Sequence, residues 1–192
     1  MKIGILGGDV KEISKSLRKE PEHLYLVLRK IAEHIALSGN DLVAIPEQGS
    51  MSEFVAEVYR ENDGNKILGI IPMQDKEFGV SEINTPVCDE MVNSGTWCNS
   101  ASTLIKRSDL IVCLGFSPRS VIELCSTRWY PREKIYVVDD LITQRLPMEV
   151  QNQLNIQYIR LREIESVISL EKENLQRPIL DESLQPEQRI RN

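Results

Sequence analysis

Residues 2–8 read Lys-Ile-Gly-Ile-Leu-Gly-Gly, a short apolar run that ends in two glycines, and this stretch decides the expected fold. Such a run followed by glycine is typical of a buried strand that turns directly into a helix. Similar short runs rich in β-branched residues recur at residues 41–45, 66–71, 109–114, 134–138 and 155–159. Several are apolar throughout, as parallel strands are when helices cover both faces. The pattern predicts a three-layer α/β fold with a mainly parallel central sheet.

Stretches with helical spacing of apolar residues separate these runs, as expected for repeated strand–helix–strand units. The expected helices cover residues 21–38, 52–61, 103–107 and 120–127, with a last one after Arg160. Gly39 follows the first of them as a C-cap signal, and Asp63-Gly64 ends the second. The alternation indicates a Rossmann-like arrangement with helices on both faces of the sheet.

Length and composition indicate one domain with a polar end. The chain has 192 residues, of which 41% are hydrophobic and 27% are charged, an ordinary composition for a globular protein. We expect one Rossmann-like domain over residues 1–170. Residues 171–192 are polar and contain two prolines, so we expect a C-terminal tail that is either solvated or docks a partner.

The charge of the chain disfavours two classes of partner. The formal net charge is −6, whereas binding to nucleic acid or to an anionic membrane relies on dense Lys and Arg patches. The first apolar run is far shorter than the roughly 20 residues that cross a bilayer. We therefore expect a cytoplasmic protein with no nucleic-acid partner and no membrane partner.

The cysteines and histidines do not form a metal-binding pattern. Four cysteines occur without a CxxC pair, and the two histidines, His23 and His34, lie far upstream on an expected helix. We expect reduced cysteines and no metal site.

Three loops at the carboxyl edge of the expected sheet are candidates for a phosphate site. In open parallel sheets ligands bind at this edge, where helix N-termini offer free N–H groups and the positive end of the helix dipole. The candidate binding residues are Gly7 and Gly8 after the first strand, Gly49, Ser50 and Met51 after the second, and Gly115, Ser117 and Ser120 after the fourth.

Each of these loops also has a purely structural interpretation. A strand-to-helix turn needs glycine whether or not a ligand approaches, and Ser50 could be a plain N-cap. Ser120 and Glu123 fit a Ser-x-x-Glu capping box. The polar stretch at residues 96–102 could cap a helix or, through Asn99, contact a ligand. The sequence leaves these alternatives open.

Arg119 and Glu123 are the charged candidates. A guanidinium at a helix start can bind a phosphate in bidentate fashion. Glu123 follows one turn after Ser120 and could assist attack by water as a general base. If a reaction occurs, these two residues are the expected catalytic pair.

Two stretches resemble the LOG-like family, also labelled lysine-decarboxylase-like, within the Rossmann-like group that includes molybdenum-cofactor carrier-like proteins. Residues 49–72 resemble its glycine loop, helix and following strand that ends in proline, and residues 108–124 resemble its strand followed by P-G-G-x-G-T-x-x-E. With the motif's Glu on Glu123, its Thr falls on Ser120. Its glycines fall on Phe116, Ser117 and Arg119. The resemblance covers roughly residues 1 to 170.

The resemblance implies a nucleotide-binding domain, and it names no particular cofactor. In catalytic members, an Arg before the helix that precedes this strand works with that Glu to cleave the N-glycosidic bond of a nucleoside monophosphate. Asn99 or Ser100 takes that place here. Because side chains project where the motif has glycines, we expect ligand binding without hydrolysis.

Three functions remain open at this stage. The first is binding of a nucleotide or related phosphorylated small molecule. The second is a nucleoside monophosphate phosphoribohydrolase-type N-glycosidase, and the third is a structural or interaction protein with a vestigial pocket. The resemblance also implies a homodimer or a higher homo-oligomer.

Overall fold

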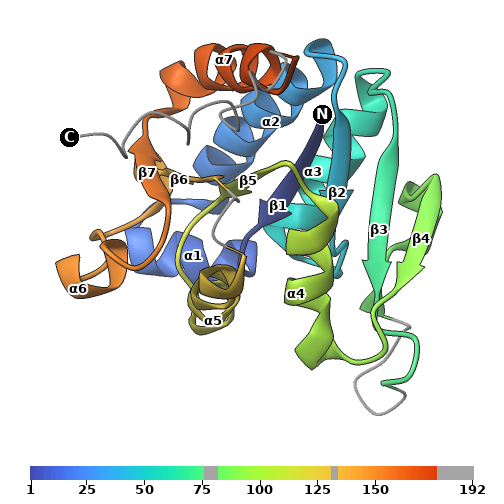
Figure 1. The fold of residues 1–192 in the computed structure, drawn as a ribbon. Helices are drawn as coiled ribbons and strands as arrows, with labels where there is room; N and C mark the ends of the chain where they lie inside the picture. The colour runs from blue at the N-terminus through green and yellow to red at the C-terminus, as the bar shows by residue number, and fades with distance from the viewer. Residues whose placement is uncertain (76–81, 131–133, 177–192) are drawn as a thin grey trace, which may run out of the picture.

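The six apolar runs of the sequence all form strands of one parallel sheet, to which a seventh strand is added (Figure 1). The computed structural model describes residues 1–75, 82–130 and 134–176. Within them the strands are β1 (Lys2–Leu6), β2 (Asp41–Ala44), β3 (Ile67–Ile71), β4 (Glu90–Asn93), β5 (Leu110–Cys113), β6 (Lys134–Val138) and β7 (Ile156–Ile159). The three-layer Rossmann-like fold expected from the sequence is confirmed.

The strand order is β4-β3-β2-β1-β5-β6-β7, and every neighbouring pair is parallel. Strand β1 lies at the centre, where Ile3 pairs with Leu42 of β2 on one side and with Leu110 of β5 on the other. The chain winds outward in both directions from this strand. The carboxyl ends of β1 and β5 therefore flank the switch point at which ligands bind in sheets of this kind.

Strand β4 is the strand that the sequence analysis missed. It forms one edge of the sheet, and three of its four residues are exposed. Because an edge strand with exposed side chains needs no continuous apolar run, it lacks the signal that marks the buried strands.

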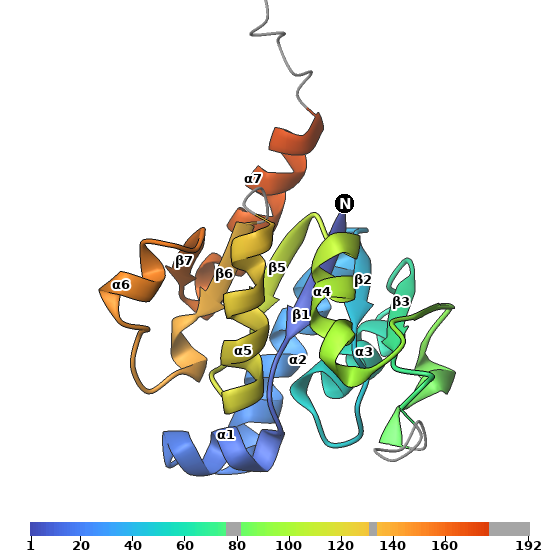
Figure 2. The same ribbon diagram turned by 60° about the horizontal axis from the view of Figure 1, so that its bottom comes forward.

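Two helical layers cover the sheet (Figure 2). One face packs against α1 (Val10–Leu17), α2 (Pro21–Leu37), α3 (Met51–Glu61) and α7 (Ile164–Gln176). The other face packs against α4 (Trp97–Arg107) and α5 (Pro118–Ser126). Short elements complete the described chain: η2 (Thr85–Val87), η3 (Thr127–Trp129), η4 (Asp139–Leu141), α6 (Met148–Gln151) and η5 (Leu161–Glu163).

Two helices begin earlier than the sequence predicts. Helix α4 starts at Trp97 instead of residue 103, and α5 starts at Pro118 instead of Ser120. Proline is well suited to the first position of a helix, because its missing N–H would have no partner there. The polar segment at residues 96–102 is thus mostly helix, so Asn99 lies within the first turn of α4.

The boundary expected at residue 170 falls inside α7, which continues to Gln176. Glu171 is buried, and its carboxylate accepts hydrogen bonds from Lys134 Nζ and Tyr136 Oη of β6, both at 2.7 Å. Lys172 Nζ donates to the carbonyl of Ser38, also at 2.7 Å. The first residues of the expected tail therefore pack against the domain, and residues 177–192 lie outside the described part of the chain.

In residues 1–75, 82–130 and 134–176, no helix combines the length and the apolar character needed to span a membrane.

Candidate functional site

The loops after β1 and β2 are bonded to each other at the carboxyl edge of the sheet. Met51 N–H donates to the carbonyl of Gly8 at 3.0 Å, and Val10 N–H donates to the carbonyl of Gly49 at 3.2 Å. Backbone groups at the starts of α1 and α3 are thereby used within the protein. The two glycine loops form one interlocked unit.

Side chains of the same loops cap the helices that follow. The Asp9 carboxylate accepts from Glu12 N–H at 3.0 Å and caps α1. Ser50 Oγ accepts from Glu53 N–H at 3.0 Å and caps α3, while the Glu53 carboxylate accepts from Gly49 N–H at 2.6 Å. Ser50 thus serves as the N-cap that its structural interpretation requires.

Helix α5 has a reciprocal cap that differs from the one in the sequence analysis. Ser120 N–H donates to Ser117 Oγ at 3.1 Å, and Ser117 N–H donates to Ser120 Oγ at 2.8 Å. The interpretation of Ser120 and Glu123 as a capping box is therefore wrong, because α5 begins at Pro118 and Ser117 is its N-cap. This frees the Glu123 carboxyl from the helix backbone and engages both serine hydroxyls instead.

At three of the candidate glycines, a Cβ atom would come very close to other protein atoms. A Cβ on Gly8 would lie 2.8 Å from the Cβ of Ser117, and one on Gly7 would lie 3.0 Å from the Cβ of Met51. Gly115 has φ +114°, and a Cβ there would lie 2.8 Å from the carbonyl oxygen of Leu141. Packing and backbone conformation alone account for glycine at these positions.

The replacement of Gly8 by alanine distinguishes packing from ligand approach. We expect Gly8→Ala to cost about 1–3 kcal/mol in unfolding free energy, because its methyl group collides with Ser117. Ser117→Gly clears that space and, as an N-cap replacement, costs roughly a few tenths of a kcal/mol. The double variant should regain most of the lost stability in urea denaturation. A Gly8→Ala protein of wild-type stability would contradict this account.

A pocket of about 560 Å³ opens at the carboxyl edge between α4 and α5. Its charged lining consists of Glu47, Asp75, Glu82, Arg119 and Glu123. The remaining lining residues are Trp97, Cys98, Ala101, Ile122 and Ser126. The loops after β2 and β3 supply three of the charged residues, and α5 supplies Arg119 and Glu123. The remaining lining residues belong to α4 and α5.

Arg119 is the central side chain of this pocket. Its Nε donates to Glu123 Oε1 at 3.0 Å, its Nη1 donates to Glu47 Oε2, and its guanidinium carbon lies 4.7 Å from the centre of the Trp97 ring. A guanidinium stacked on an indole and bonded to two carboxylates is held firmly in one orientation. The helix start, the β2 loop and α4 all contribute to this cluster.

Glu123 is the buried carboxyl of the pocket, with only 8% of its side chain exposed. Burial raises its pKa above the usual 4.5, the Glu47 carboxylate adds to this rise, and the neighbouring Arg119 opposes it. A carboxyl whose pKa is raised next to a pocket is a recognised feature of functional sites.

The structure brings Arg119 and Glu123 together but places the other candidates elsewhere. The candidates that do not line the pocket are Gly7, Gly8, Gly49, Ser50, Met51, Asn99, Gly115, Ser117 and Ser120. Asn99 is exposed on α4, and Ser100 is buried against Ser94 Oγ at 2.8 Å. These loop residues shape the edge of the sheet, and their role as ligand contacts stays a prediction.

Sequence reasoning missed eight of the ten described lining residues, among them Glu47, Asp75, Glu82 and Trp97. One of them had a usable signal, because Glu47 follows β2 directly and so belongs to a strand-end loop. The stacking of Trp97 with Arg119 could not be derived from the spacing of residues in the sequence. Asp75 caps the start of α4 by accepting from Trp97 N–H at 3.0 Å.

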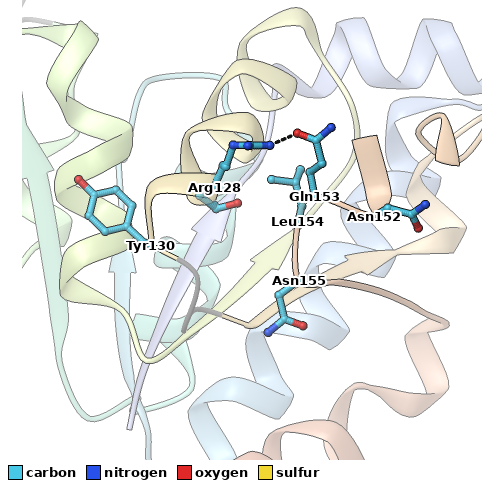
Figure 3. Close-up of a pocket in the computed structure, with 7 residues that line it drawn as sticks. Arg128, Tyr130, Asn152, Gln153, Leu154 and Asn155 are labelled. Atoms are coloured by element: carbon cyan, nitrogen blue, oxygen red, sulfur yellow. Dashed lines mark hydrogen bonds between the residues drawn. The ribbon is translucent and has the colours of Figure 1, made fainter. Parts of the chain in front are cut away.

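A second, smaller pocket of about 240 Å³ lies at the opposite edge of the sheet, before β6 and β7 (Figure 3). Arg128 of η3 reaches across to the side-chain oxygen of Gln153, and the rest of the lining includes Tyr130, Asn152 and Asn155. Arg128 is the one charged residue in the described lining. The candidate chemistry therefore lies in the pocket between α4 and α5.

Several solved structures have a similar fold. The alignment with the molybdenum cofactor binding protein of Rippkaea orientalis covers 91% of this chain and 96% of that protein's chain, with a TM-score of 0.64 and 16% sequence identity. The alignment with the molybdenum cofactor carrier protein of Chlamydomonas reinhardtii covers 90% of this chain and 98% of that protein's chain, with a TM-score of 0.65 and 12% sequence identity. The chain shares the fold of these carrier proteins. The alignment with the structural genomics target TM1055 covers 88% of this chain and 98% of that protein's chain, with a TM-score of 0.68 and 16% sequence identity.

Comparisons of sequence gave no further assignment. No model of a known protein family matches the chain, and no curated protein matches it. Within the part of the chain that the structure describes, no group of three or more His, Cys, Asp or Glu side chains is arranged to hold a metal ion. All four cysteines are free thiols.

The raised pKa of Glu123 gives a testable pH dependence of stability. The folded state binds the Glu123 proton more tightly than the unfolded state does, so this contribution to stability is full below 4.5 and declines as the pH rises through the folded pKa. Replacement by glutamine removes the titration. We therefore expect Glu123→Gln to gain stability relative to the wild type as the pH rises from about 4 to about 7.

Urea denaturation at several pH values measures this difference. The exposed Glu61, which pairs with Arg29 on the helical face opposite the pocket, provides a control in Glu61→Gln. If the wild type instead gains on Glu123→Gln as the pH rises, the pKa of Glu123 is lowered and the assignment is wrong.

Proposed function

We propose that the protein binds a phosphate-bearing small molecule at the carboxyl edge of its sheet, without hydrolysing it. A nucleotide and a molybdenum cofactor are the candidate ligands, the second because structures with the same fold are molybdenum cofactor binding and carrier proteins. The observation that carries the proposal is Arg119, a cation in the first turn of α5 at the mouth of a ligand-sized pocket.

Arg119 retains donors for a ligand. Its Nε and Nη1 are bonded to carboxylates, whereas Nη2 has no hydrogen-bond partner among the described residues. The side chain is 38% exposed, so a phosphate can approach it from solvent. The positive end of the α5 dipole adds to the attraction of an anion at this position.

Glu47 competes with such a phosphate for the Arg119 guanidinium. Its side chain is 30% exposed and lies on a loop, while Glu123 is fixed on α5 and buried. Exchange of Glu47 for a phosphate therefore requires a change in one loop side chain and leaves the buried pair in place. This makes Glu47 a determinant of affinity.

The altered family motif supports binding without hydrolysis. Side chains occupy the positions of its glycines, and Glu123 Oε1 is bonded to Arg119. One observation favours the alternative, a phosphoribohydrolase-type N-glycosidase with Glu123 as general base and Arg119 at the ribosyl phosphate. Glu123 is buried beside the pocket with a raised pKa, as catalytic carboxyls often are.

A ligand panel distinguishes these functions. We would incubate the protein with nucleoside mono-, di- and triphosphates and with molybdenum cofactor, and record thermal shift and free-base release together. We expect a rise in Tm without base release. Glu47→Gln should tighten binding about 3-fold to 10-fold because it removes the competing carboxylate, and Arg119→Gln should abolish binding.

Arg29→Gln is the matched control, because Arg29 also pairs with a glutamate but lies away from the pocket. Base release that Glu123→Gln abolishes would establish the hydrolase instead. No thermal shift with any ligand would favour an interaction protein with a vestigial pocket. Weaker binding by Glu47→Gln would show that Glu47 contacts the ligand and does not compete with it.

We also propose that the protein forms a homodimer or a higher homo-oligomer in the cytoplasm. A large apolar side chain of η3 that lies outside the pocket between α4 and α5 supports association, since Trp129 is 77% exposed. The four free thiols support a reducing compartment.

Light scattering after size exclusion tests the oligomer. We expect Trp129→Glu to give a monomer, because a carboxylate in an apolar interface is strongly unfavourable. Glu165→Lys, at a charged position on α7 whose side chain is 76% exposed, should leave the assembly unchanged. A wild-type monomer would contradict the proposal.

A further inference from the structure

The described lining of the pocket between α4 and α5 carries more negative than positive charge. Among the described residues that line it, the carboxylates are Glu47, Asp75, Glu82 and Glu123, and the one cation is Arg119. Arg119 is already bonded to two of these carboxylates. The potential inside the pocket therefore attracts cations and repels a second anion.

Glu123 offers an unused acceptor to the pocket. Its side chain is more than nine-tenths buried, and Oε1 receives the hydrogen bond of Arg119. Oε2 has no hydrogen-bond partner within residues 1–75, 82–130 and 134–176. This oxygen is not fully buried, so a ligand N–H in the pocket can reach it and donate a charge-assisted hydrogen bond.

Part of the pocket wall is apolar. Trp97 and Ala101 of α4 and Ile122 of α5 line it. The indole N–H of Trp97 is buried and has no acceptor among the described residues. Such a wall suits a planar ring, which packs against an indole and aliphatic side chains.

From these three observations we infer that the pocket binds an aromatic group bearing a positively charged amine, with the amine at Glu123 and the ring against Trp97 and Ile122. The inference rests on the proposed ligand-binding function and names the chemistry of the group that enters the pocket. A ligand phosphate would then lie outside the pocket, at Nη2 of Arg119.

A pair of probes of similar shape and opposite charge tests the inference. Tryptamine carries an ammonium on an indole, and indole-3-propionate carries a carboxylate on the same ring. Binding is followed by the indole N–H signals in a nitrogen-correlated NMR spectrum. The chain has two tryptophans, and Trp129 on the exposed η3 segment serves as an internal control for Trp97.

We expect tryptamine to shift the Trp97 signal and leave that of Trp129 unchanged, with an affinity at least about 10-fold above that of indole-3-propionate. Glu82→Gln removes one rim carboxylate and should weaken tryptamine about 2-fold to 5-fold. Glu90→Gln, an exposed carboxylate of β4 that pairs with Lys66, should have no effect.

Glu123→Gln removes the buried carboxylate and should weaken tryptamine more than Glu82→Gln does, with the native spectrum confirming that the variant is folded. Equal or tighter binding of indole-3-propionate would overturn the inference. So would the lack of any Trp97 shift with tryptamine up to about 10 mM, a concentration at which even weak binding is visible.

The tryptamine test and the ligand panel can fail independently of each other. Phosphate ligands that raise the Tm while tryptamine fails would contradict the amine preference and leave the proposed function intact. Tryptamine binding without any response to phosphate-bearing ligands would leave the amine site intact and contradict the proposed function.

Discussion

The burial of β1 between β2 and β5 is the constraint on which the rest of the structure depends. Ile3 and Ile5 point to the face covered by α1, α2, α3 and α7, and Leu6 points to the face covered by α4 and α5. Gly4 admits Leu104 and Ser108 of the α4 segment, since a Cβ there would lie 2.3 Å from Ser108 Oγ. Both helical layers are thus positioned by one five-residue strand, and the site forms where its neighbours end.

The fold places a site at that edge, but the charges of the side chains there decide which ligands can bind. A glycine loop that cradles phosphate needs free N–H groups, but here serine, aspartate and backbone groups of the loops cap α1, α3 and α5. The remaining cation, Arg119, is shared by Glu47 and Glu123. Chains with this fold can therefore present very different ligand chemistry while the strands and helices stay the same.

Sequence patterns predicted the strands well because burial on both faces requires an apolar run, and they failed at β4, whose edge position removes that requirement. They located Arg119 and Glu123, since both follow a strand end closely in sequence. They missed Asp75, Glu82 and Trp97, whose approach to Arg119 depends on how separate strands and loops meet in space. The serine and glycine candidates were ambiguous because capping and phosphate binding use the same residue types.

Helix α7 joins parts of the chain that are made at very different times. Glu171 reaches Lys134 and Tyr136 of β6, and Lys172 reaches the carbonyl of Ser38 at the end of α2. During synthesis on the ribosome, α2 emerges long before this helix can cover its apolar neighbours. The nascent domain consequently exposes that surface until α7 leaves the exit tunnel, which is the interval in which chaperones have access to it.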